Sequence, residues 1–286
     1  MTEAGERYIL NIACPDTVGI VAAVSGFLAE QGLFITESHH FGDVETGRFF
    51  MRTVFHPTGP HFSLSRCRES FGQIGERFDM NWAIYDAAVP PRVLLMVSRF
   101  DHCLNDLLYR VRTGSLQMEV AAIVSNHMDL SGIARAHGIP FFHVPVTKDT
   151  KSHAEERLFD IIAETGSELV VLARYMQILS DDACGKLKGR VINIHHSFLP
   201  SFKGARPYHQ AHARGVKLIG ATAHFVTGNL DEGPIIAQAV TPVDHSTSAE
   251  EMVAQGRDIE AQVLARAVRA YVERRLFLNG TKTVVF

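Results

Sequence analysis

The feature that most constrains the fold is a regular alternation of apolar strands and amphipathic helices that begins at Arg92. Short apolar runs alternate with segments whose apolar residues recur at helical spacing. Such alternation is typical of a mostly parallel, doubly wound α/β sheet with helices on both faces. The predicted strands cover residues 92–98, 120–125, 141–146, 169–173 and 191–195, and the predicted helices cover 103–114, 129–137, 153–165 and 181–188.

Two more strands and a long helix are predicted after this alternation. The strands cover residues 218–226 and 234–243, and the helix runs from Ser248 to about residue 276. Ser248 with Glu251, and Ser152 with Glu155, match the capping-box pattern, in which a serine and a glutamate three residues later bond each other's backbone N–H. We therefore expect two helices to begin at these serines.

The strand at 191–195 ends in polar side chains where a buried strand normally carries hydrocarbon. Because strand side chains alternate, Asn193 and His195 are predicted on one side, about 7 Å apart along the strand, and His196 on the other. A carboxamide and an imidazole are suitable donors for a carbonyl oxygen that becomes negative during attack. Ligands of open α/β sheets bind outside the carboxyl ends of the strands. The strand end is therefore the predicted site, and the alternative is a pair of polar groups satisfied by their neighbours.

The first 86 residues predict a separate domain with a different element order. Strands are predicted at 8–14, 33–37, 49–55 and 82–85, with one helix after Asp16, its candidate N-cap, ending at Gly32, and another at 63–78. The order βαββαβ is ferredoxin-like. Residues 87–91 are small and proline-bearing, as in a linker. We therefore expect domains at 1–86 and 92–286.

Composition excludes several classes of protein. Basic residues number 28 and acidic residues 31, so the net charge of −3 lacks the basic surplus of a nucleic-acid-binding protein. No apolar run approaches the ~20 residues of a membrane helix, and the polar N-terminus does not resemble a secretory signal. The four cysteines are scattered, so free thiols and a cytoplasmic location are expected.

Nucleotide cofactors and metals are not expected. The first turn of the second domain, residues 98–103, lacks the glycines of a dinucleotide or phosphate loop, which argues against NAD or ATP. The 15 histidines raise the alternative of a metal-dependent hydrolase, with His209 and His212 on one helix face beside Asp231. The sequence supplies no convincing further ligand for such a site.

The polar strand end belongs to a larger set of motifs. Asn193-Ile194-His195 is followed by the turn Leu199-Pro200-Ser201-Phe202-Lys203-Gly204 and by a strand with His224, which leads to Asp231-Glu232-Gly233. This set resembles the formyltransferase-fold enzymes that use 10-formyltetrahydrofolate, over residues 92 to about 275. The resemblance implies that Asn193, His195 and Asp231 are catalytic.

The segment after the fourth strand of the second domain also resembles that family. Leu172-Ala173, Met176 and Ile178-Leu179-Ser180 are similar to its folate-binding loop. By this resemblance Gln177 and Leu179 line the pterin pocket, and backbone near Val226 and Thr227 binds the pterin edge.

Two features direct the resemblance to one branch of the family. The turn Cys14-Pro15-Asp16-Thr17-Val18-Gly19 and the βαββαβ order resemble the ACT domain, a regulatory module that commonly binds amino acids and dimerises. The turn at 98–103 replaces the glycine-rich turn that holds the phosphate of a ribonucleotide acceptor in glycinamide ribonucleotide formyltransferase. An ACT module fused to this body resembles the formyltetrahydrofolate deformylase family.

That resemblance implies a function. We expect hydrolysis of 10-formyltetrahydrofolate to tetrahydrofolate and formate, which supplies formate and balances the one-carbon folate pool for purine biosynthesis. No cofactor is required, and the expected partners are the folate substrate, an amino-acid effector at the ACT domain and further copies of the chain, with neither nucleic acid nor membrane.

Several alternatives stay open at this point. The same residues could serve a formyltransferase that uses an amine acceptor, and the first domain could be a ligand-free oligomerisation module. A third alternative is a folate or amino-acid sensor with an inactive site, against which the intact Asn193, His195 and Asp231 argue. The sequence does not tell which of His195 and Asp231 transfers which proton. We expect His196 to pack away from the site and His224 to support Asp231.

Overall fold

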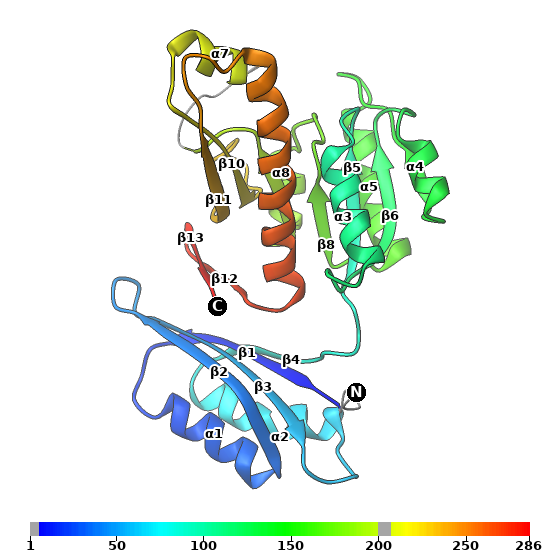
Figure 1. Cartoon of the computed structure of the whole chain (residues 1–286). Helices are drawn as coiled ribbons and strands as arrows, with labels where there is room; N and C mark the ends of the chain where they lie inside the picture. The colour runs from blue at the N-terminus through cyan, green and yellow to red at the C-terminus, as the bar shows by residue number, and fades with distance from the viewer. Residues whose placement is uncertain (1–5, 200–206) are drawn as a thin grey trace. The chain divides into compact units, whose positions relative to one another are not determined.

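The computed structural model describes residues 6–199 and 207–286, which divide into two compact units (Figure 1). One unit holds the described residues up to Pro90, together with Arg274–Asn279 and Val284–Phe286. The other holds Pro91–Glu273 and Gly280–Thr283. The predicted turn from Pro200 to Gly204 lies outside the described residues.

The first unit is a four-stranded antiparallel sheet with two helices. Its strands pair in the order β2-β3-β1-β4, which together with the βαββαβ order confirms the predicted ferredoxin-like fold. The elements are β1 (Tyr8–Pro15), α1 (Ile20–Glu30), β2 (Leu33–Asp43), β3 (Arg48–Pro57), α2 (Leu64–Arg77) and β4 (Asn81–Asp86).

The core of this unit lies between one face of the sheet and the two helices, and it contains Leu10, Ile12, Met51, Val24 and Phe71. The predicted cap of α1 is wrong. Gly19, not Asp16, occupies the N-cap position, with a φ of 99° that L side chains rarely adopt. The predicted end of α1 at Gly32 is confirmed.

The chain ends in a hairpin that the sequence did not predict, formed by β12 (Leu276–Asn279) and β13 (Lys282–Val285). The long helix α8 (Ala249–Val272) ends earlier than the predicted residue 276. The Phe277 ring packs 5.8 Å from the Phe50 ring, and Asn279 Nδ2 donates a hydrogen bond to Asp43 Oδ2. Residues from the end of the chain therefore complete the first unit.

The second unit contains a seven-stranded sheet with the order β11-β10-β9-β8-β5-β6-β7. The strands from β9 to β7 in this order are parallel, whereas β10 and β11 add an antiparallel edge, so the predicted mostly parallel, doubly wound sheet is confirmed. Its strands are β5 (Arg92–Val97), β6 (Glu119–Ser125), β7 (Phe141–His143), β8 (Leu169–Leu172), β9 (Val191–His195), β10 (Leu218–Phe225) and β11 (Ile235–Pro242).

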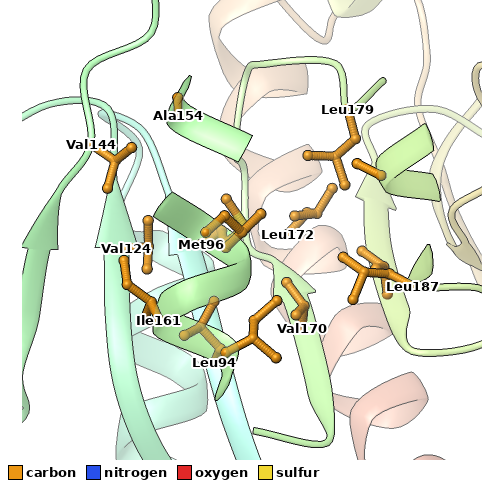
Figure 2. Packing of buried hydrophobic residues seen from close by; sticks show 14 of the residues in the cluster. Leu94, Met96, Val124, Val144, Ala154, Ile161, Val170, Leu172, Leu179 and Leu187 are labelled. Atoms are coloured by element: carbon orange, nitrogen blue, oxygen red, sulfur yellow. The ribbon is translucent and has the colours of Figure 1, made fainter. Parts of the chain in front are cut away.

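Helices cover both faces of this sheet. Figure 2 shows the core on one face, where Leu94 of β5 and its register partner Val170 of β8 meet Ile161 of helix α5. On the other face, α8 packs against β9, β10, β11 and α3. The helices are α3 (His102–Arg112), α4 (Ser131–Ala136), α5 (Lys151–Thr165), α6 (Asp181–Lys186), α7 (Pro207–Arg214) and α8.

One of the two predicted capping boxes forms. Ser248 and Glu251 make both reciprocal bonds at the start of α8. The other prediction is wrong, because Thr150 is the N-cap of α5 and the Glu155 carboxylate accepts the Ser180 backbone N–H instead. The four cysteines are free, as expected. Within residues 6–199 and 207–286, no helix has the length and apolar character needed to span a membrane.

Candidate active site

A cavity of about 620 Å³ lies where strands β8 and β9 end. This is the edge of an open α/β sheet at which ligands bind. The cavity wall includes all seven site residues predicted from the sequence, namely Asn193, His195, Asp231, Gln177, Leu179, Val226 and Thr227. The structure therefore brings together residues that lie up to 54 positions apart in the chain.

The pairing of β9 with β10 positions the predicted polar residues. In this antiparallel ladder Asn193 lies opposite His224, and His195 lies opposite Thr222. Directly opposite side chains point to the same face, so Asn193 Nδ2 comes within 3.3 Å of His224 Nε2. The buried Thr222 hydroxyl donates to the Ser197 carbonyl and accepts the Leu199 N–H. The bend after His195 is therefore held by its neighbouring strand.

The hydrogen bonds of His224 define its tautomer and orient Asn193. His224 Nδ1 lies 2.9 Å from the Phe225 carbonyl oxygen, which can only accept, so Nδ1 carries the proton. Asn193 Nδ2 can only donate, so His224 Nε2 accepts one N–H of this carboxamide. The second N–H of that carboxamide stays available at the cavity wall.

His195 and Asp231 form a buried pair. His195 Nδ1 lies 3.2 Å from Asp231 Oδ1, and both side chains are largely buried. Burial acts to raise the pKa of the Asp231 carboxyl, but the bond from His195 and the nearby imidazole of His224, whose Nε2 lies 3.7 Å from Oδ1, outweigh it and hold this pKa well below its usual range. His195 Nε2 is buried and has no hydrogen-bond partner among the described residues.

The backbone around Asp231 is shaped for this contact. Asp231 has a φ of 58°, in the left-handed region, where aspartate occurs more often than most residues. A Cβ on Gly233 would lie 1.7 Å from the Phe225 carbonyl oxygen and 3.3 Å from His224 Nδ1. Only glycine allows the turn to pass this close to Phe225 and His224. This turn places the Asp231 carboxylate next to His195.

The predicted pterin pocket lies on the segment that follows β8, and two contacts hold it. The Met176 N–H donates to Ser98 Oγ at 2.9 Å, and the Ser180 N–H donates to Glu155. Between these points Leu179 is buried, whereas Met176 and Ile178 are exposed and line the cavity. This apolar wall is suited to a flat ring system.

A second polar cluster on the cavity wall was missed by the sequence analysis. Glu260 of α8 is 1% exposed, and its carboxylate accepts hydrogen bonds from His102 Nε2 and Tyr208 Oη, each at 2.8 Å. Arg174 Nε lies 3.4 Å from the same carboxylate. The signal in the sequence was a charged residue on the apolar stripe of α8, one turn after the buried Gly256.

His196 also lies on the cavity wall, contrary to the prediction that it packs on the opposite face. Strand β9 ends at His195, so the alternation of side chains ends there too. The His196 ring lies 5.0 Å from the His195 ring and 6.5 Å from that of Tyr208.

The metal alternative is not supported by its predicted ligands. Within the described residues, the side chains of His209, His212 and Asp231 are not close enough together to bind one metal ion. The group of side chains that does have the spacing of metal ligands consists of His102, Cys103 and Glu260. Burial raises the pKa of the Cys103 thiol well above its usual value, and the guanidinium beside Glu260 disfavours a second cation.

Comparison with known proteins places this site in a family. Residues 91–268 match the formyl transferase family model. The chain is 50% identical to a formyltetrahydrofolate deformylase from Corynebacterium sp. (strain P-1) over 279 residues, which is 98% of each chain. The chain belongs to the formyltetrahydrofolate deformylase family. The family membership that the sequence motifs predicted is thus confirmed.

Solved structures agree with this membership. A formyltetrahydrofolate deformylase from Burkholderia mallei ATCC 23344 has a TM-score of 0.95 and 54% identity, and the match covers 98% of this chain and 99% of the other. A glycinamide ribonucleotide transformylase from Symbiobacterium toebii has a TM-score of 0.64 and 30% identity over 69% of this chain and 94% of its own. The match to this deformylase spans both units, whereas the transformylase matches only part of the chain.

Proposed function

We propose that this protein hydrolyses 10-formyltetrahydrofolate to tetrahydrofolate and formate. The observation that carries the proposal is the buried His195, whose Nδ1 is paired with Asp231 while Nε2 has no partner among the described residues. The relatives named as formyltetrahydrofolate deformylases over nearly the whole chain support hydrolysis over transfer.

In the proposed mechanism the pterin occupies the pocket at Gln177, Leu179, Val226 and Thr227, and the formyl group lies at His195. Water adds to the formyl carbon, and the carbonyl oxygen becomes negative. The free N–H of Asn193 and the protonated His195 Nε2 donate to that oxygen, and loss of one such donor typically costs about 10²–10³ in kcat.

The pair geometry also suggests how the protons move. Asp231 engages Nδ1 and its pKa is held low, so it remains a carboxylate that orients His195 and stabilises the imidazolium. Nε2 then exchanges protons with the reacting groups. The C–N10 bond breaks as N10 gains a proton, and the formic acid that is released ionises to formate.

The test is formate release from 10-formyltetrahydrofolate with no amine present. Wild type should release formate, and Asp231→Asn should reduce kcat by about 10³–10⁴, because the carboxamide cannot stabilise the imidazolium. Glu232→Gln removes the neighbouring charge and should stay within about threefold of wild type. If wild type consumes substrate only when an amine is supplied, the protein is a formyltransferase and this proposal is wrong.

We further propose that residues 1–86 form an ACT-like regulatory domain that binds an amino-acid effector and pairs copies of the chain. The ferredoxin-like element order supports this assignment. The enzyme would need no cofactor and would act in the cytoplasm, where its formate would enter purine biosynthesis and its turnover would balance the one-carbon folate pool. Equilibrium sedimentation, and thermal shifts with individual amino acids, would test oligomerisation and effector binding.

A further inference from the structure

Arg174 is a buried cation that makes little use of its hydrogen-bonding capacity within residues 6–199 and 207–286. Its side chain is 10% exposed, and it lies on the wall of the active-site cavity. Among the described residues its guanidinium has an ion pair with Glu260 at 3.4 Å and a stacking contact 5.3 Å from the Phe100 ring centroid, but no hydrogen bond. A guanidinium carries five N–H donors in a planar fork. Most of the Arg174 donors therefore have no partner among the described residues.

The ion pair with Glu260 does not fully neutralise the charge of Arg174. The Glu260 carboxylate already accepts hydrogen bonds from Tyr208 and His102. Burial acts to raise the pKa of Glu260, but the His102 bond and the Arg174 charge lower it overall, so the group is a carboxylate. Because Glu260 shares its negative charge among Arg174, His102 and Tyr208, the positive charge of Arg174 is only partly compensated.

The cluster is built rather than accidental. The Tyr208 ring lies so close to α8 that a Cβ on Gly256 would come within 2.1 Å of it. Arg174 has a φ of 66°, a strained value for a long side chain. Burying an ion pair seldom adds stability, because the loss of hydration cancels the attraction. Strain and desolvation at a cavity wall therefore point to a ligand-binding role.

The position of the cluster indicates which ligand. Arg174, His196 and His195 line the same cavity, and the His196 ring lies 5.0 Å from the His195 ring. In the proposed reaction the formyl group arrives neutral and leaves as an anion, since water adds to its carbon, the C–N10 bond breaks and the acid loses its proton. A planar carboxylate is thus formed in the cavity that Arg174 lines, and a planar guanidinium fork binds carboxylates through two parallel hydrogen bonds.

We propose that Arg174 is the binding group for the formate product, with the Phe100 ring and the Glu260 carboxylate holding its guanidinium in place. This inference rests on the proposed hydrolysis, because formate is the carboxylate made in this cavity. The other carboxylate that could reach Arg174 belongs to the glutamate tail of the folate.

Formate binding can be measured without turnover, by line broadening of ¹³C-formate in solution with the protein. Wild type should broaden the signal saturably, and Arg174→Gln should weaken binding about tenfold or more, the usual effect of losing a charge-assisted pair. Arg112→Gln is the matched control, because Arg112 also stacks 5.6 Å from an aromatic ring, that of Tyr109, but is exposed and does not line the cavity, and this variant should bind formate within twofold of wild type. Arg174→Lys, which keeps the charge without the fork, should be intermediate.

Each other outcome overturns the proposal. If formate shows no saturable broadening with the wild-type protein, the proposal is wrong. This test needs no variant, so it holds even if Arg174→Gln fails to fold. If Arg174→Gln binds formate normally but raises KM for 10-formyltetrahydrofolate and not for the analogue without glutamate, Arg174 binds the tail instead. Failure of the proposed hydrolysis is distinguishable, since it would appear as saturable formate binding by a protein that releases no formate.

Discussion

At the scale of single residues, the end of β9 shows where alternation holds and where it stops. Asn193 and His195 line the cavity together, as the period of a strand predicts. His196 was predicted on the opposite face, but the backbone bends after His195, where Thr222 holds Ser197 and Leu199. The bend depends on a residue of β10, so the local sequence contained no sign of it.

Burial of His196 should make the stability of the protein depend on pH. Burial, together with Arg174 and His195, lowers the pKa of His196 from 6.5 to about 4. The unfolded chain therefore binds more protons between these values, so the free energy of unfolding falls as pH drops from 7 towards 4. At pH 5 the loss is about 2 kcal/mol relative to pH 7.

Denaturant unfolding at pH 7 and pH 5 measures this loss. His196→Gln should remove about 2 kcal/mol of the pH dependence, whereas His153→Gln, whose side chain is 90% exposed, should keep the wild-type dependence. Equal pH dependence in wild type and His196→Gln would contradict the assignment of a neutral, buried imidazole.

At the scale of elements, the segment after β8 should control substrate affinity through Ser98. The Ser98 hydroxyl donates to Asn126 Oδ1 at 2.7 Å and accepts the Met176 N–H. Ser98→Ala leaves both groups without this partner, at a cost of about 1–3 kcal/mol. Because the segment carries Gln177 and Leu179 of the proposed pterin pocket, we expect KM for 10-formyltetrahydrofolate to rise about 5- to 30-fold, with kcat changed less than threefold.

Steady-state kinetics of Ser98→Ala and Ser115→Ala would test this role. Ser115 is exposed on the turn after α3, so its variant should match wild type. A fall in kcat at unchanged KM would show that Ser98 acts on the chemical step rather than on substrate binding.

Helix starts show which elements could be predicted from the sequence. The capping box of α8 is a local arrangement in which both partners lie within four residues, and it was predicted correctly. The same pattern at Ser152 and Glu155 failed, because Glu155 bonds Ser180, 25 positions further along the chain. A side chain with a distant partner leaves no local pattern, and the Glu260 cluster was missed for the same reason.

At the scale of the whole molecule, the strand–helix alternation was sufficient to predict the parallel sheet, because buried parallel strands read as continuous apolar runs. The direction of β10 and β11 could not be predicted in this way, since apolar strands do not indicate whether they run parallel or antiparallel. The hairpin of β12 and β13 follows the second unit in sequence yet belongs largely to the first. Four-residue strands are too short to show a period.

Because this hairpin supplies core side chains, the first unit should depend on the end of the chain. Phe277 is 8% exposed and packs against Phe50 and Phe286, so Phe277→Ala should lower the free energy of unfolding of the first unit by about 3–5 kcal/mol. Phe41→Ala is the control, since Phe41 is 46% exposed and should cost less than about 1 kcal/mol. Hydrogen exchange of the β3 amides reports the effect directly, because β3 carries Phe50. Exchange in β3 that is unchanged by Phe277→Ala would mean that the first 90 residues hold their sheet together without the hairpin.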